Sequence, residues 1–170
     1  AFGEKMGKAV PRGVWNYGGE ADLGFGAALR AAATVVTDDP IFGPIAYGGT
    51  LAGAGEWTEV VPRDGLRQRL HILRGEVRAG LVLERDGFAP ETAVRIRGAL
   101  EEVRFVLENR TGDGHRTRLR ASGWPTGEYE VEVDGRSAGR FSARGGEAAS
   151  VDVPLSGRRD SASVIIRRAK

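Results

Sequence analysis

The clearest pattern in the chain is a strict alternation of acidic and apolar residues over residues 128–134. Tyr129, Val131 and Val133 fall on one side of an extended strand there, and acidic residues fall on the other. This alternation is typical of a strand that is covered on one face only. Further strands are predicted by the same reasoning, and the full set is residues 66–74, 77–85, 92–96, 100–108, 115–121, 128–134, 140–143, 149–155 and 163–168.

Turn signals separate these predicted strands at hairpin spacing. They are Arg85-Asp86-Gly87, Thr111-Gly112-Asp113-Gly114, Asp134-Gly135, Gly145-Gly146 and Ser156-Gly157. Short strands with one apolar face and hairpin-length connections are typical of β-sandwiches. The pattern therefore predicts a mainly β protein, with an antiparallel β-sandwich over residues 58–170.

Residues 1–57 have a different character, with 12 of the 26 glycines and 7 of the 12 aromatic residues. The alanine-rich run from Leu23 to Val36 predicts a helix, which Asp38-Asp39-Pro40 ends because the residue before proline is disfavoured in the helical region. Residues 40–57 are predicted as loop. A helix with small side chains all round lets other helices approach closely, so we expect it to be buried in a helical assembly. The expected domains are thus a helical, glycine- and aromatic-rich segment over 1–57 and the sandwich over 58–170.

Composition excludes several classes of protein. The chain has 170 residues, 41% of them hydrophobic, which suffices for a sizeable core, and it has no cysteine for disulfides or thiolate metal sites. No stretch approaches the roughly 18 apolar residues of a membrane span. The net charge is only +2 and the arginines are dispersed, so nucleic-acid binding is not expected. The opening Ala1-Phe2-Gly3-Glu4 is interpreted as a cut end.

Metal and cofactor chemistry is not expected either. His71 and His115 lack companions at ligand spacing, so we predict no metal site. The glycine patterns do not match a dinucleotide or phosphate-binding fingerprint, and no serine stands in a nucleophile elbow. We therefore predict no organic cofactor.

The most site-like segment runs from Trp15 to Gly26. Its aromatic and polar side chains suit a carbohydrate groove, since aromatic faces stack on the C–H faces of sugars and carboxylates and amides bind hydroxyl groups. Glu20 and Asp22 are the candidate catalytic carboxylates, although their i,i+2 spacing on a helix lets at most one reach the scissile bond. Alternatively, both acids only favour the positive end of the helix dipole. The candidate substrate-binding residues of the chain are Trp15, Asn16, Tyr17 and Trp57.

Two tryptophans and the arginines of the predicted strands have more than one interpretation. Trp57 either lines a groove or seals the junction of the two predicted domains, whereas Trp124, before Pro125, is interpreted as a plug at the sandwich edge. Arginines at alternate strand positions are interpreted as solvated outer faces that pair with glutamates.

Several segments resemble a known family. Residues 18–30 (GGEADLGFGAALR), 39–43 (DPIFG) and 46–49 (AYGG) resemble the end of the helical domain in a family of large secreted bacterial and fungal proteins, which is similar to the six-hairpin (α/α)-toroid glycosidases. Residues 81–88 (LVLERDGF) and 127–131 (GEYEV), followed by Asp134-Gly135, resemble the β-domain that such enzymes carry after the toroid. The resemblance implies the end of a helical toroid and a bracing sandwich, in a secreted or extracytoplasmic protein.

The leading hypothesis is that the chain is the C-terminal portion of a carbohydrate-active enzyme, either a glycoside hydrolase or a transglycosidase. Its partners would be a poly- or oligosaccharide and the remainder of the helical domain, on the same or another chain. The fragment alone is expected to be inactive. The alternative is a non-catalytic β-sandwich module that binds glycan or protein, and a structural protein without a ligand is a third possibility.

Overall fold

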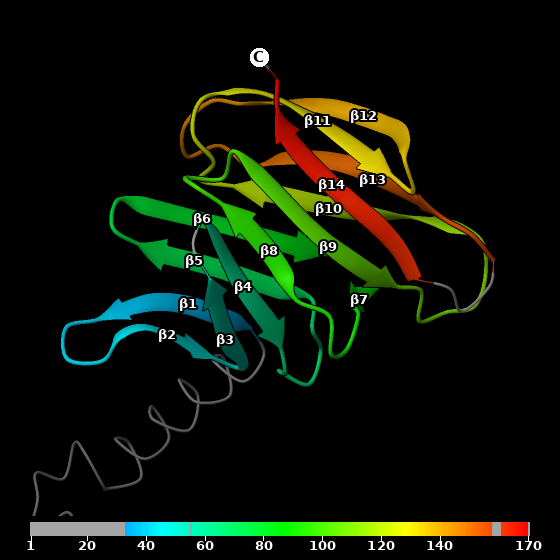
Figure 1. Ribbon diagram of the computed structural model, residues 1–170. Coiled ribbons are helices and arrows are strands. Elements are labelled where there is room, and N and C mark those ends of the chain that lie inside the picture. The colour runs from blue at the N-terminus through cyan, green and yellow to red at the C-terminus, as the bar shows by residue number, and fades with distance from the viewer. Residues whose placement is uncertain (1–32, 55, 158–160, 170) are drawn as a thin grey trace, which may run out of the picture. The chain divides into compact units, whose positions relative to one another are not determined.

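The computed structural model describes residues 33–54, 56–157 and 161–169, which form two β-sheets packed as a sandwich (Figure 1). Sheet A has the order β13–β10–β6–β5–β1–β2, and sheet B has the order β12–β11–β14–β9–β8–β4–β3, with β7 beside β9. The strands of sheet A are β1 (Thr34–Asp39), β2 (Gly43–Tyr47), β5 (Arg69–Arg74), β6 (Val77–Leu83), β10 (His115–Ser122) and β13 (Ala149–Leu155). Those of sheet B are β3 (Gly49–Ala54), β4 (Trp57–Pro62), β7 (Gly87–Phe88), β8 (Val94–Arg97), β9 (Glu102–Glu108), β11 (Gly127–Val133), β12 (Arg136–Ala143) and β14 (Ser161–Arg168). The predicted mainly β sandwich is confirmed.

All nine strands predicted over residues 66–168 are present, with ends that differ by a few residues. The sequence predicts these strands because each has its own alternation of apolar and polar residues. In β11, Tyr129, Val131 and Val133 are buried between the sheets, as the alternation predicts. The turn after β11 has positive φ angles at Asp134 (49°) and Gly135 (77°), which are the angles a tight hairpin turn needs.

The predictions of a helix end and a loop over residues 34–57 are wrong. Residues 34–36, the last three of the predicted helix, begin strand β1, and β2 and β3 lie within the predicted loop. Four consecutive β-branched residues over 34–37 favour an extended strand over a helix. Asp39 does not end a helix, because its Oδ1 accepts hydrogen bonds from the backbone N–H groups of Ile41 and Phe42 in the β1–β2 turn.

The rest of the predicted helix, residues 23–32, and the expected toroid end lie outside the described residues. The described residues group as one compact unit, and the composition change near residue 57 falls in the turn between β3 and β4.

Not every strand pair of the sandwich is antiparallel, since β1 runs parallel to β5, with Thr34 opposite Leu70. The chain then crosses from sheet A to sheet B at Gly48 and Gly49. A Cβ atom on Gly49 would lie 2.7 Å from the carbonyl oxygen of Val61, so only glycine fits this crossing. The Thr34 hydroxyl, 2.8 Å from the Gly48 carbonyl oxygen, fixes the same corner.

One continuous hydrophobic core fills the space between the sheets. Within this core, the rings of Phe88 and Phe105 meet edge to face, with centroids 5.4 Å apart. Trp124 is only 2% exposed, which confirms the packing interpretation for that residue. Within the described ranges, no helix has the length and hydropathy that crossing a membrane would require.

Candidate functional site

Trp57 is the one predicted site residue that the structure describes. Trp15, Asn16, Tyr17, Glu20 and Asp22 lie outside the described residues, so their predicted roles stay predictions. Trp57 is the first residue of β4 and is half-buried. The candidate site is therefore built outward from this residue.

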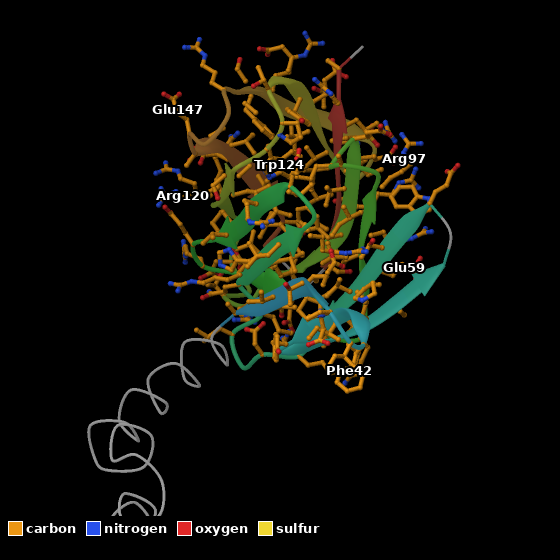
Figure 2. The ribbon with its side chains drawn as sticks, turned by 90° about the vertical axis from the view of Figure 1, so that its left-hand side faces the viewer. Phe42, Glu59, Arg97, Arg120, Trp124 and Glu147 are labelled. Atoms are coloured by element: carbon orange, nitrogen blue, oxygen red, sulfur yellow. The ribbon has the colours of Figure 1, made fainter. Side chains whose placement is uncertain are left out.

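Two rows of side chains cross the outer face of sheet B, perpendicular to its strands. Strand pairing fixes both rows, because residues directly opposite each other on neighbouring antiparallel strands share a face. The first row runs through Trp57, Arg97, Glu102, Arg167, Glu130 and Arg140, and the second through Glu59, Arg95, Arg104, Ile165, Glu132 and Ser137. We call these twelve residues the ladder face, and Figure 2 shows Glu59 and Arg97 on that side of the sandwich.

Three guanidinium groups lie over the indole ring of Trp57. The Cζ atoms of Arg95, Arg104 and Arg97 lie 4.8, 5.1 and 5.6 Å from the ring centroid. At these distances the ring quadrupole attracts the cations. The three contacts restrain the orientation of the indole, which stays partly accessible on the sheet surface.

Glu102 anchors the arginines from below. Its side chain is only 5% exposed, and it accepts a hydrogen bond from Nε of Arg104. Its Oε2 lies 3.2 Å from Nη2 of Arg97 and 3.7 Å from Nε of Arg167. A nearly buried carboxylate thus holds three cations, two of which contact Trp57. Arg95 and Arg104 stand directly opposite each other, and their repulsion is offset by separate acceptors, Glu59 for Arg95 and Glu102 for Arg104.

The ladder face is electrically balanced around Trp57. The ion pairs there join the arginines Arg95, Arg97, Arg104 and Arg167 to the glutamates Glu59, Glu101, Glu102 and Glu132. The interpretation of alternating arginines as outer-face partners of glutamates is confirmed for Arg95, Arg97 and Arg104. Their pairing offers donors and acceptors on one surface without a large net charge.

A hollow opens on the same face at a β-bulge between Val131 and Glu132. Its volume is about 70 Å³, and Glu132, Ile165 and Arg167 contribute to its lining. Strands lie about 4.8 Å apart, so three to four strand spacings, or about 14–19 Å, separate the hollow from Trp57. An extended ligand could contact both places.

A second polar cluster joins three loops at one end of the sandwich. Nε2 of His115 lies 2.8 Å from Oδ2 of Asp86, a carboxylate that is fully buried in the β6–β7 loop. Nδ1 of His115 lies 2.8 Å from the Asp113 carbonyl oxygen. Asn109 donates from Nδ2 to the carbonyl oxygens of Asp113 and Ser156, at 3.0 and 2.6 Å. These contacts tie the β6–β7, β9–β10 and β13–β14 loops together.

The geometry of this loop cluster favours a structural role, in which hydrogen bonds hold the three loops together. The hydrogen bond to the Asp113 carbonyl and the one to Asp86 raise the pKa of His115. Each ring nitrogen faces an acceptor, and this geometry favours the doubly protonated ring. The Thr111 hydroxyl lies 3.3 Å from Nδ1 of His115, which already faces the Asp113 carbonyl oxygen.

We expect the loop cluster to make stability fall as the pH rises above neutrality. Because the pKa of His115 is raised in the folded state, its stabilisation is complete below the unfolded value of 6.5 and is lost as the pH passes through the folded pKa. Burial and the charge of Arg69 lower the pKa of His71. This residue therefore has the opposite effect on stability, which should fall as the pH drops below 6.5. Urea unfolding between about pH 5.5 and pH 8.5 measures both effects.

Two variants separate these effects. In His115→Gln, the free energy of unfolding should decline less steeply above pH 6.5. In His71→Gln, that decline should remain, and the increase in the free energy of unfolding as the pH rises toward 6.5 should disappear. An undiminished decline in His115→Gln would show that another group causes it.

Metal ligation finds no support in the described part of the chain, which contains no group of three or more candidate ligand side chains. The fold and the ladder face define an all-β sandwich whose candidate site is a flat, polar and aromatic sheet surface. Comparisons of the chain with protein-family models, curated proteins and solved structures found no match.

Proposed function

We propose that the sandwich is a non-catalytic module of a secreted carbohydrate-active protein and that it binds a poly- or oligosaccharide on the ladder face. The observation that carries this proposal is Trp57, an orientated and partly accessible indole surrounded by paired guanidinium and carboxylate groups. An indole face stacks on the C–H face of a pyranose ring. The paired charges around it donate to and accept from hydroxyl groups.

The charge balance of the ladder face favours a neutral polysaccharide over a polyanion. Each arginine near Trp57 already has a carboxylate partner, such as Glu59 for Arg95 at 2.8 Å. An acidic polymer would have to displace these partners and would meet their negative charge. Binding of a neutral glycan should therefore persist at high salt, because it does not depend on long-range attraction.

The catalytic part of the leading hypothesis supplies the context for this module. Glu20 and Asp22 are the proposed catalytic carboxylates, with Trp15, Asn16 and Tyr17 as the proposed contacts to the sugar. The sandwich would then keep a polysaccharide bound to the same polypeptide as that chemistry, and the 170-residue chain alone would not turn it over.

We expect the 170-residue chain to bind at least one neutral polysaccharide from a panel of xylan, mannan, β-glucan and chitin, measured by affinity electrophoresis and calorimetry. Trp57→Ala should lower the affinity about 30-fold or more, since it removes the stacking surface. Trp57→Phe should retain part of the affinity, because a smaller aromatic face remains.

The matched control is Arg120→Ala, on the outer face of sheet A, where Figure 2 shows Arg120 on the side away from Arg97. This exposed residue should not affect binding. Tight binding to polygalacturonate that weakens steeply with salt would contradict the neutral ligand. Equal binding by Trp57→Ala and the unchanged chain, or no binding across the panel, would refute the proposal.

A further inference from the structure

The tip of the β1–β2 hairpin exposes two large apolar side chains. Ile41 is 83% exposed and Phe42 is 79% exposed, more than any other large hydrophobic residue among those described. Isolated exposed apolar residues are common on protein surfaces, but two adjacent ones at a protruding tip form a concentrated patch. We call Ile41 and Phe42 the hairpin tip.

The hairpin tip is held in a defined conformation. Oδ1 of Asp39 accepts hydrogen bonds from the backbone N–H groups of Ile41 and Phe42, at 2.8 and 2.9 Å. Pro40 and Pro44 flank these residues and restrict the backbone further. A pre-organised apolar tip loses little conformational entropy on binding, which favours its use as an anchor.

An apolar cleft of about 410 Å³ opens at the same end of the sandwich, between sheet A and sheet B. Its lining includes Ile72, Val77, Ile96 and Leu100, with Arg74 among its polar groups. In Figure 1 the β1–β2 hairpin and the β5–β6 turn, which contributes to the cleft, lie at the same left-hand end. Figure 2 looks onto that end, with Phe42 at its lower margin.

The cleft has the size and polarity that the hairpin tip needs. A cavity of about 150 Å³ lined by aliphatic side chains accommodates a benzene ring, so the cleft has room for a phenyl and a butyl group. Arg74 lines the cleft, where Nε binds Asp38 at 2.8 Å and Nη1 donates to the Thr58 hydroxyl at 3.1 Å, and no partner of its Nη2 is found among the described residues. A carboxylate that enters with the tip, such as Asp39, would complement this guanidinium, and hydrogen bonds from the tip backbone lower the pKa of Asp39.

We propose that the hairpin tip of one copy of this chain inserts into the end cleft of a second copy, so that the two copies form a two-fold symmetric dimer. A two-fold interface uses the same patch on both subunits, and this end carries both the projection and the complementary hollow. Each copy then inserts its tip into the cleft of the other copy within a single interface. Neither the hairpin tip nor the lining of the cleft includes a residue of the ladder face, and the dimer inference does not rest on the proposed glycan binding.

The oligomeric state of the full chain tests this inference, by sedimentation velocity over a range of concentrations up to high micromolar. A reversible monomer–dimer equilibrium is expected. Phe42→Ala should raise the dimer dissociation constant at least about 30-fold, since it removes a central anchor. Ala99→Trp should do the same by filling the mouth of the cleft, because Ala99 is an exposed residue of its lining.

Leu66→Ala is the matched control, since Leu66 is 48% exposed but lies outside the tip and the cleft. It should leave the dissociation constant unchanged. Circular dichroism and thermal unfolding would verify that every variant folds.

Disulfide trapping gives a second readout, because the chain has no cysteine of its own. A mixture of Phe42→Cys and Ala99→Cys chains should form a mixed disulfide faster than either chain forms a disulfide with itself. A chain that stays monomeric overturns the proposal, as does a dimer insensitive to Phe42→Ala. A dimer that is weakened by Phe42→Ala but not by Ala99→Trp would mean that the tip binds outside the cleft, which overturns the proposal. Phe42-dependent binding of the monomer to phosphatidylcholine vesicles would assign the tip to a membrane surface and would also overturn the proposal.

Discussion

Trp124→Ala should lower the free energy of unfolding by about 3–5 kcal/mol, as for other large aromatic side chains removed from a core. Trp124 meets Tyr129 edge to face at 5.0 Å between ring centroids and Phe141 at 5.7 Å. Tyr129 and Phe141 are themselves stacked, 5.2 Å apart. The Tyr129 hydroxyl donates to the Pro125 carbonyl oxygen at 2.9 Å and so holds the backbone beside Trp124. Urea unfolding followed by far-ultraviolet circular dichroism measures the loss.

Trp124→Phe is the control for this prediction. It keeps an aromatic ring in the cluster and removes an indole N–H that is buried without a hydrogen-bond partner among the described residues. It should therefore destabilise the protein much less than Trp124→Ala. A loss below about 1 kcal/mol in Trp124→Ala would show that the site collapses around the smaller residue and that the aromatic cluster contributes little.

Local patterns predicted the later strands because each carries its own signal. In β11 and β14, alternate residues are buried, and hairpin turns define the ends of most neighbours. Strand β1 lacks such a signal, since it follows an alanine-rich run and pairs in parallel with β5, more than thirty residues further along the chain. Its β-branched residues were the available clue. The strands β2 and β3 are short and rich in small residues, so only tertiary pairing identifies them.

The ladder face shows the same limit for the candidate site. Alternating arginines predicted a charged outer face, and pairing with glutamates confirms it. The sequence could not place Arg104 beside Trp57, because that contact depends on the registers of β4, β8 and β9 together. Likewise, the sequence did not predict the contact between His115 and Asp86, because these residues are 29 positions apart and only the fold brings them together.

Glu102→Ala should lower the free energy of unfolding by about 2–3 kcal/mol. Removing one member of a buried ion pair costs about 3–5 kcal/mol when the remaining charge is buried. Here the remaining charges are on Arg97, Arg104 and Arg167, whose side chains are 41–48% exposed, so water replaces part of the lost interaction. Their mutual repulsion and the loss of hydrogen bonds to a charged acceptor account for the rest.

Glu101→Ala is the matched control, since Glu101 lies next along the chain, is 61% exposed and, among the described residues, forms an ion pair only with Arg97, at 4.0 Å. It should change stability by less than about 0.5 kcal/mol. Glu102→Ala should also release Arg97 and Arg104 from their fixed positions and therefore weaken glycan binding at Trp57, whereas Glu101→Ala should not. Equal unfolding free energies for the two variants would mean that the nearly buried carboxylate is not the anchor of the ladder face. A loss of stability in Glu102→Ala with unchanged glycan affinity would separate the anchor from the binding surface.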